Sequence, residues 1–199
     1  MHSSSFGILF LTGVLAVASA GPGPRVSRVG PDSTVAGLSR LVGLWGPSAS
    51  SPRAAQRPEL RRRVVHDYSW TVQGKALRLR EGYALGHREM AELDGLIYWN
   101  PATERIEFVA VGGPGPAEGR LFLGEYRLLA DSAIERIYDV FYRTLADTPG
   151  EELGGARRRY REVYRPVGPD TIEATLDWWR GGRWEPFGPG TYTVVRLAA

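Results

Sequence analysis

The chain has 199 residues, of which 43% are hydrophobic and 24% are charged, and its formal net charge is +3. This composition excludes a disordered chain and a bundle of membrane helices, and the length suits one domain with a leader. Cysteine is absent from the sequence, so neither a disulfide framework nor a cysteine-linked lipid anchor is available to the chain.

The N-terminus predicts a secretory signal peptide over residues 1–20. An apolar run at 6–17 is followed by Ala18-Ser19-Ala20, and this small-x-small pattern is typical of a cleavage site. The run is shorter than the ~20 residues that a membrane-spanning helix needs. Residues 1–5 carry no Lys or Arg, which is unusual for such a leader. We expect cleavage near Ala20, a secreted or periplasmic location, and no integral membrane span.

The next segment, residues 21–37, is rich in Gly, Pro and Ser and predicts a flexible linker. Residues 38–46 then form a compact apolar stretch, and residues 47–58 are again rich in Ser, Ala and Pro. We therefore expect one folded domain over residues 38–199.

From residue 62 onward the pattern is that of β-strands. β-Branched and aromatic residues fill short segments, and turn signals recur about every 8–12 residues. The expected strands are 64–71, 76–83, 95–99, 104–111, 120–129, 157–165, 171–179, 184–187 and 190–197. This order indicates an all-β fold, an antiparallel meander closed or nearly closed into a barrel of about 8–10 strands.

The segment 133–146 is ambiguous. Residues 132–135 match a helix capping box, and the apolar residues that follow recur at helical spacing. As a strand, the same segment would place Ile134, Tyr138 and Val140 on one face. We predict a strand, because the segment is rich in β-formers and its neighbours are strands.

Two positions resemble a known superfamily. Gly43-Leu44-Trp45 is a Gly-x-Trp motif that opens a meander, and Arg196 lies on the last expected strand. Over residues 38–197 the chain resembles the calycins, which include lipocalins, fatty-acid-binding proteins and nitrobindin-like barrels, and above all the uncharacterised bacterial lipocalin-like domains. The resemblance implies that Trp45 packs under Arg196 and closes one mouth of the barrel, with the guanidinium on the indole face.

The chain also lacks two ligand-binding motifs that occur in calycins. Nitrobindin-like barrels hold haem through a C-terminal His, whereas no His follows His87 here. Fatty-acid-binding proteins hold a carboxylate with Arg-x-Tyr, whereas Arg196 is followed by Leu197 and Ala198. We therefore expect no cofactor.

Aromatic residues give the strongest functional signal. Tyr combines an apolar ring with a polar tip, which suits a cavity that holds an amphiphile. The candidate ligand-binding residues are His66, Tyr68, Trp70, Tyr83, Tyr98, Phe108, Tyr138, Tyr160 and Trp178. They predict a barrel that binds a small hydrophobic or amphipathic molecule, and a barrel filled by its own side chains is the alternative.

Catalytic and metal motifs are weak. On a strand, His66 points away from Asp67 and Ser69, so these three do not form a triad within the strand. Clustered Cys or His for zinc is also missing from the sequence. The enzyme alternative is an isomerase or lyase that uses His66 with Tyr68 or Glu162 for acid–base work.

Arginine supplies almost all of the positive charge, since Lys75 is the single lysine among 25 basic residues. On a strand, Arg157, Arg159 and Arg161 share one face, and Arg158 lies on the other. We interpret the first three as a solvated outer face and expect no nucleic-acid partner. An anion-binding stripe, or an interaction module that uses this face, is the alternative.

Overall fold

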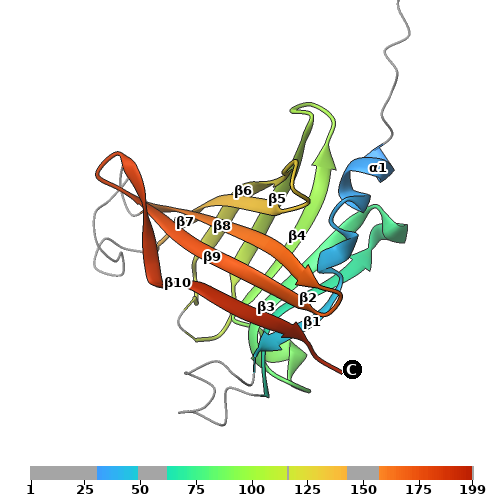
Figure 1. Ribbon diagram of the computed structural model, residues 1–199, viewed down its shortest axis with the longest axis horizontal. Helices are drawn as coiled ribbons and strands as arrows, with labels where there is room; N and C mark the ends of the chain where they lie inside the picture. Colours follow the sequence, from blue (N-terminus) through green and yellow to red (C-terminus); the bar gives the residue numbers. More distant parts are fainter. Residues whose placement is uncertain (1–30, 49–61, 116, 143–156, 199) are drawn as a thin grey trace, which may run out of the picture.

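A computed structural model describes residues 31–48, 62–115, 117–142 and 157–198 (Figure 1). Ten antiparallel strands of these ranges form one closed barrel. In chain order they are β1 (Gly43–Pro47), β2 (Arg63–Thr71), β3 (Ala76–Ala84), β4 (Leu93–Asn100), β5 (Arg105–Gly112), β6 (Leu121–Leu128), β7 (Ile134–Phe141), β8 (Arg157–Gly168), β9 (Thr171–Arg180) and β10 (Arg183–Arg196). The predicted all-β meander barrel is confirmed, and it has ten strands.

Four short helical segments have all their residues within the described ranges. They are α1 (Pro31–Ala36), η1 (Ser39–Leu41), η3 (Val72–Gly74) and η4 (Arg88–Met90). Among the residues described, no helix has the length and apolar character needed to cross a membrane.

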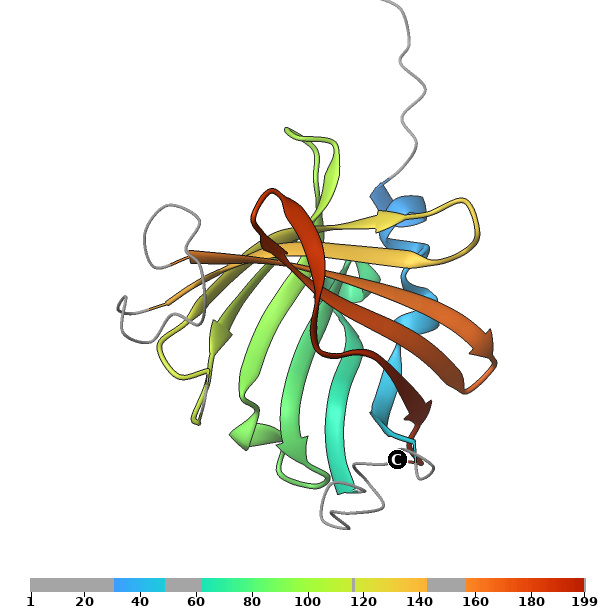
Figure 2. The ribbon, with the colours of Figure 1, turned by 60° about the vertical axis from the view of Figure 1, so that its left-hand side comes forward.

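The strands from β2 to β9 each pair with the next strand in the chain, and β1 closes the barrel between β10 and β2. This closing strand is short. It joins β10 through three residue pairs and β2 through three, and Trp45 is opposite both Arg196 and His66. Figure 2 shows β10 (dark red) running across the barrel to end beside β1 (blue).

The ambiguous segment forms a strand, as predicted. β7 alternates buried and half-buried residues along its length and pairs over eight residues with each of β6 and β8. The expected helix N-cap, Ser132, has a φ of 65°, whereas an N-cap needs an extended conformation. Ser132 therefore serves in the turn between β6 and β7, and residues 143–146 lie outside the described ranges.

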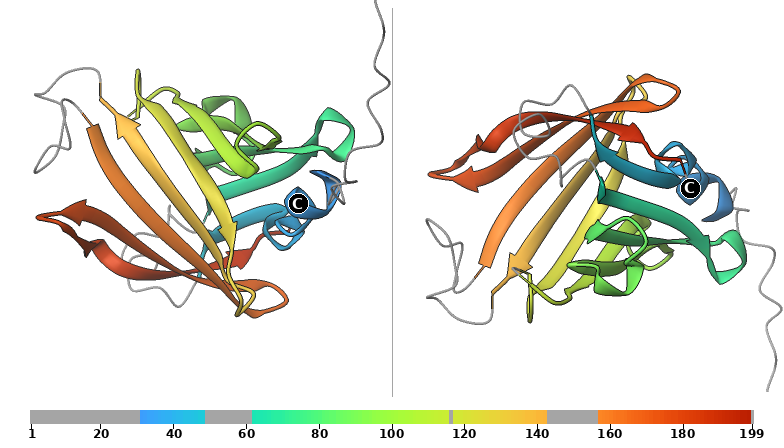
Figure 3. Two further views of the ribbon diagram at one scale, coloured as in Figure 1. Left: turned by 90° about the horizontal axis from the view of Figure 1, so that it is seen from above. Right: turned by 90° about the horizontal axis from the view of Figure 1, so that it is seen from below.

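The packed part of the chain begins earlier than predicted. Residues 31–37 were expected to belong to a flexible linker, but α1 occupies most of them, and Val35 and Leu38 are buried in the main core. Figure 3 shows α1 and η1 (blue) near the β2–β3 turn at one end of the barrel. The predicted signal peptide and residues 21–30 lie outside the described residues.

This same end of the barrel holds the closure implied by the resemblance. The guanidinium carbon of Arg196 lies 4.4 Å from the ring centroid of Trp45, and Nη1 of Arg196 donates to the backbone oxygen of Val42 at 2.6 Å. The indole nitrogen of Trp45 donates to the backbone oxygen of Leu41 at 2.7 Å. Trp45 thus fixes η1 against the last strand and gives one end of the interior a floor.

Candidate functional site

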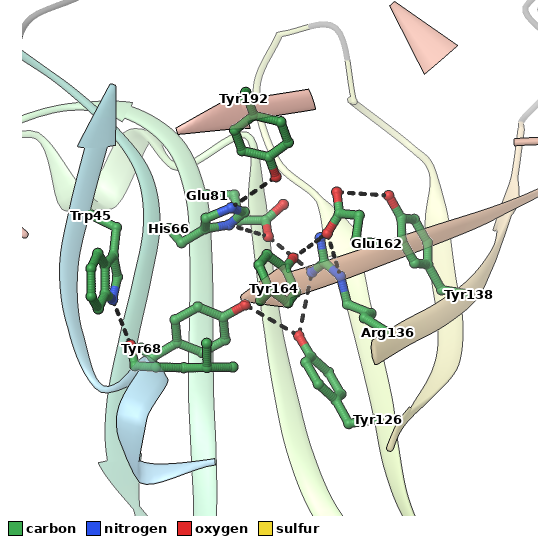
Figure 4. Close-up of polar contacts among 11 residues, drawn as sticks. Trp45, His66, Tyr68, Glu81, Tyr126, Arg136, Tyr138, Glu162, Tyr164 and Tyr192 are labelled. Carbon is green, nitrogen blue, oxygen red and sulfur yellow. Dashed lines mark hydrogen bonds and ion pairs between the residues drawn. The ribbon is translucent and has the colours of Figure 1, made fainter. Parts of the chain in front are cut away.

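The interior of the barrel contains a polar cluster made by side chains from five strands. His66 comes from β2, Glu81 from β3, Arg136 from β7, Glu162 from β8 and Tyr192 from β10. Figure 4 shows these side chains converging on one another inside the barrel. Charged side chains are rarely this buried unless they are paired, so the pairing of each one matters.

Arg136 is the centre of the interior cluster. It is 1% exposed, and its Nε and Nη2 donate to Oε2 of Glu162 at 2.9 and 2.5 Å. Its Nη1 donates to Oε1 of Glu81 at 2.9 Å. Burial alone would lower the pKa of Arg136, but the two carboxylates outweigh it and raise this pKa well above its usual value. Arg136 is therefore a fixed cation that bridges opposite walls of the barrel.

His66 extends the cluster on the side of Glu81. Its Nδ1 lies 2.9 Å from Oε1 of Glu81, and its Nε2 lies 3.3 Å from the hydroxyl of Tyr192. An ionised carboxylate only accepts hydrogen bonds, so Nδ1 carries a proton. When the imidazole is neutral, Nε2 then accepts a hydrogen bond from the hydroxyl of Tyr192. The carboxylate therefore fixes the tautomer and orientation of the ring.

Glu81 is held in its ionised form. Burial raises its pKa, but the charges of Arg136 and His66 and their hydrogen bonds outweigh burial and lower the pKa of Glu81 to about 2. The Glu81 side chain is 19% exposed although it points into the interior. Solvent therefore reaches this part of the cluster.

Tyrosine hydroxyls complete the cluster. Tyr164 donates to Oε2 of Glu162, Tyr138 donates to Oε1 of Glu162 at 3.5 Å, and the hydroxyls of Tyr68 and Tyr126 lie 3.4 Å apart. Burial raises the pKa of Tyr126 to about 12. Burial is also the largest cause that raises the pKa values of four other phenols well above the usual value, those of Tyr68, Tyr138, Tyr164 and Tyr192. These phenols are neutral donors at any physiological pH.

Aromatic rings lead from this cluster toward the other end of the barrel. The ring of Tyr138 stacks on Tyr160 with centroids 5.6 Å apart, and Tyr160 meets the edge of Phe187 at 5.3 Å. Phe187 in turn lies 5.4 Å from Trp178. These four residues are called the aromatic ladder below. The stretch of the interior from this cluster to Trp178 is thus polar at one end and aromatic at the other. Apolar side chains such as Leu38 and Leu41 fill the floor beside Trp45.

A buried arginine lies at the aromatic end. Arg158 is 0% exposed and is opposite Val140 on β7, one inward position beyond Tyr160. Nearby, the hydroxyls of Tyr142 and Tyr160 lie 3.0 Å apart, and Arg120 lies over the ring of Tyr142 at 4.6 Å. Two arginine side chains, Arg120 and Arg158, therefore lie at the aromatic end of the interior.

Most of the predicted ligand-binding residues lie in the interior. His66, Tyr68, Phe108, Tyr138 and Tyr160 are buried there, and Trp178 packs partly buried against the same core. The structure brings these six together.

Three predicted residues lie elsewhere. Trp70 is 39% exposed near the end of β2. Tyr83 packs in a second, smaller apolar cluster with Val64 and Ala91, and its hydroxyl donates to Asp67 at 2.6 Å. Tyr98 lies on the outer face, where its hydroxyl donates to Glu107 at 3.1 Å, because the buried Ile97 takes the inward position on β4. Tyr98, a candidate ligand-binding residue, therefore does not point into the interior.

Sequence reasoning missed Glu81, Arg136, Tyr126, Tyr164 and Tyr192, and named Glu162 only in the enzyme alternative. A signal for the two charged residues was present. Arg136 follows Ile134 at the two-residue spacing of a buried face, and Glu81 follows Leu79 in the same way. A charged residue in a buried phase of a strand indicates an ion pair or a site.

The arginine-rich segment of β8 divides as predicted. Arg159 forms a two-bond ion pair with Asp139, and Arg161 forms one with Asp177, both on the outer face. Arg157 lies 3.9 Å from Asp139. Because carboxylates already lie beside these guanidinium groups, the outer face favours a solvated ion-pair network over an anion-binding stripe.

The chain matches no protein-family model, and no curated protein aligns with it significantly. Within the described ranges, no group of three His, Cys, Asp or Glu side chains is arranged to hold a metal ion. The closed ten-stranded antiparallel barrel is compatible with a calycin-like fold.

Proposed function

We propose that this barrel is a binding protein that holds a small amphipathic molecule in its interior. The observation that carries the proposal is the division of the interior into a polar end and an aromatic end. The cluster around Arg136 supplies hydrogen-bonding groups, and the aromatic ladder supplies apolar area. A molecule with a polar head and an apolar body matches this division.

Partial exposure of inward-facing side chains supports a ligand more than a filled barrel. Tyr192 and Trp178 are only half-buried, and the Glu81 side chain is 19% exposed, although all three face the interior or its core. A barrel filled to the density of a protein core would leave such side chains without contact to solvent.

Two further expectations belong to the same proposal. The contact between Trp45 and Arg196 supports membership of the calycin superfamily, where that closure recurs. The apolar run at 6–17 followed by Ala18-Ser19-Ala20 supports export, which would place the binding site in the periplasm or outside the cell.

Native mass spectrometry of the protein purified from its host tests ligand binding directly. We expect a co-purifying small molecule, and a hydrophobic dye that binds the barrel and is displaced by that molecule. Tyr160→Leu removes a ring of the aromatic ladder and should weaken dye binding. Tyr98→Leu changes an outer-face tyrosine and should not. A protein that carries no ligand and binds no dye would refute the proposal.

One observation favours an enzyme as the second candidate. His66 has both a carboxylate and a phenol within hydrogen-bonding reach, at 2.9 and 3.3 Å, which is the arrangement that acid–base catalysis needs. The ligands carried by the wild type and by His66→Asn discriminate between the two functions. A binder carries the same molecule in both proteins. An enzyme carries product in the wild type and substrate in the variant.

A further inference from the structure

We propose that the polar end of the interior recognises a protonated amine on its ligand, and that it discriminates against a carboxylate. This inference rests on the proposed binding function and names the head group that the site takes. It departs from what a calycin with an arginine-held fatty acid would show.

Arg136, the cation at the polar end, already has carboxylate partners within the barrel. Each of the three guanidinium nitrogens of Arg136 donates to a carboxylate, two to Glu162 and one to Glu81. With the 3.5 Å bond from Nη1 to the hydroxyl of Tyr126, four of its five N–H groups are used, so a ligand carboxylate could make two bonds to Arg136 only by displacing one of these partners. Leaving a buried charge without its partner is strongly unfavourable.

The exposed part of the cluster offers hydrogen-bond acceptors instead. Oε1 of Glu81 takes the bonds from both His66 and Arg136, and Oε2 of Glu81 makes no hydrogen bond within the described part of the chain. Figure 4 shows Glu81, Tyr192 and Glu162 around the same part of the interior. An ammonium group has three donors and no acceptor, so it complements the second oxygen of Glu81 and the hydroxyl oxygen of Tyr192.

Charge balance favours the same head group. Glu81 and Glu162 carry two negative charges and Arg136 carries one positive charge, so these three charges sum to −1 before His66 is counted. A bound ammonium brings this sum to zero, whereas a carboxylate brings it to −2. Because the cluster lies in a medium of low dielectric constant, that difference acts strongly on affinity.

The aromatic ladder suits the apolar body of the ligand. The guanidinium carbon of Arg136 lies 4.7 Å from the ring centroid of Tyr138 and 5.4 Å from that of Phe108, so Arg136 itself makes the cation–π contacts at the polar end. The ladder from Tyr138 to Trp178 then offers a surface along which an aromatic or short aliphatic body can lie.

Arg158 suggests a competing interpretation, in which the ligand is an anion. This buried arginine lies at the aromatic end, so an anionic ligand would lie in the reverse direction, with its head toward Arg158. The acceptor groups around Glu81 would then face the apolar end of the ligand, a pairing that costs free energy because those groups lose their solvent. The structure therefore favours the orientation with an amine at Glu81.

Three probes with the same phenyl-ethyl body test the head group. They are 2-phenylethylamine, 2-phenylethanol and 3-phenylpropionate, titrated at neutral pH by calorimetry. We expect the amine to bind at least about tenfold more tightly than either of the others, as expected for a charge pair made in a desolvated site. Equal binding of all three, or tightest binding of 3-phenylpropionate, would overturn the ammonium proposal and leave ligand binding intact. If none binds and none displaces a hydrophobic dye, ligand binding itself is wrong.

Two variants of like chemistry assign the effect to Glu81. Glu81→Gln keeps the size of the side chain and should bring the affinity for the amine to within about threefold of that for the alcohol, because the charge pair is lost. Glu173→Gln removes an exposed carboxylate from the outer face of β9 and should keep the full preference. A Glu81→Gln protein with native near-ultraviolet circular dichroism and an unchanged preference would overturn the proposal. Binding of 3-phenylpropionate that is lost in Arg158→Gln would overturn it as well, since it would place the head group at the other end.

Discussion

Arg136 and Glu162 are directly opposite each other on β7 and β8, and their side chains meet inside the barrel with Nε 2.9 Å from Oε2. Cross-strand pairs are the unit from which a sheet gains its stability. Arg159 forms a cross-strand pair with Asp139 between the same two strands on the outer face, so the barrel provides its own internal comparison.

Removal of the buried arginine should destabilise the protein far more than removal of an exposed one. Arg136→Met leaves Glu81 and Glu162 without their partner and should lower the free energy of unfolding by about 3–5 kcal/mol. Arg159→Met breaks the outer ion pair with Asp139 and should cost less than about 1 kcal/mol. Urea unfolding measures both. Equal losses in the two variants would contradict the buried network.

The low pKa of Glu81 predicts a loss of stability in acid. Because the pKa falls from 4.5 in the unfolded chain to about 2 in the folded one, the ionised carboxylate stabilises the fold fully above pH 4.5. That contribution is lost as the pH falls from about 4.5 to about 2. Unfolding curves over this window should show a steeper decline for the wild type than for Glu81→Gln. Parallel declines would contradict the prediction.

The stacked pair at the closed end should be sensitive to the shape of its cation. Arg196→Lys keeps the charge but loses the flat group over Trp45, and should cost about 1–2 kcal/mol of stability. It should also change the fluorescence of Trp45. Arg183→Lys, whose guanidinium pairs with Glu185 at an exposed position, is the matched control and should have little effect. A similar response of both variants would argue against a special role for Arg196.

One glycine of β6 is fixed by the approach of the next strand. A Cβ at Gly124 would lie 2.2 Å from the backbone oxygen of Ile137 on β7, so Gly124→Ala forces the two strands apart. We expect a loss of about 1–3 kcal/mol or more, seen as a lower midpoint of thermal unfolding. At Gly168 of β8 a Cβ would find Thr171 at an ordinary 3.9 Å, so Gly168→Ala should be tolerated. Tolerance at both positions would refute the close approach of β6 and β7.

Export predicts a defined mature N-terminus. When the full chain is produced in a host that secretes it, N-terminal sequencing of the exported protein should begin at Gly21. Recovery of the intact chain of 21.9 kDa from the cytoplasm alone would contradict a cleaved leader.

The strands and their order could be predicted because the sequence repeats local signals. Apolar alternation and turn residues mark each hairpin, and in a meander neighbours in sequence are neighbours in space. The segment around β7 shows where such signals conflict. Its capping-box residues favour a helix locally, but two adjacent strands offer eight residue pairs each, and those tertiary contacts decide the outcome.

The site was harder to predict because it depends on which strand faces meet. Tyr98 and Ile97 are both good strand residues, and sequence alone does not decide which of them points inward. The partners of Arg136 lie on β3 and β8, far apart along the chain, and only barrel closure brings them together. The hydrophobic members of the interior were therefore easier to name than the charged ones.

β1 pairs with β2 and with β10 through three residues each, and these pairings set the order in which the barrel can be completed during synthesis. β2 to β9 can pair in turn as they leave the ribosome, but β1 has no second partner until residues 194–196 of β10 have been made. Until then the nascent sheet has two free edges, and free edges are where chains aggregate. Truncation before Val194 should therefore leave an open, aggregation-prone sheet, whereas the full-length chain ends its folding by sealing this seam.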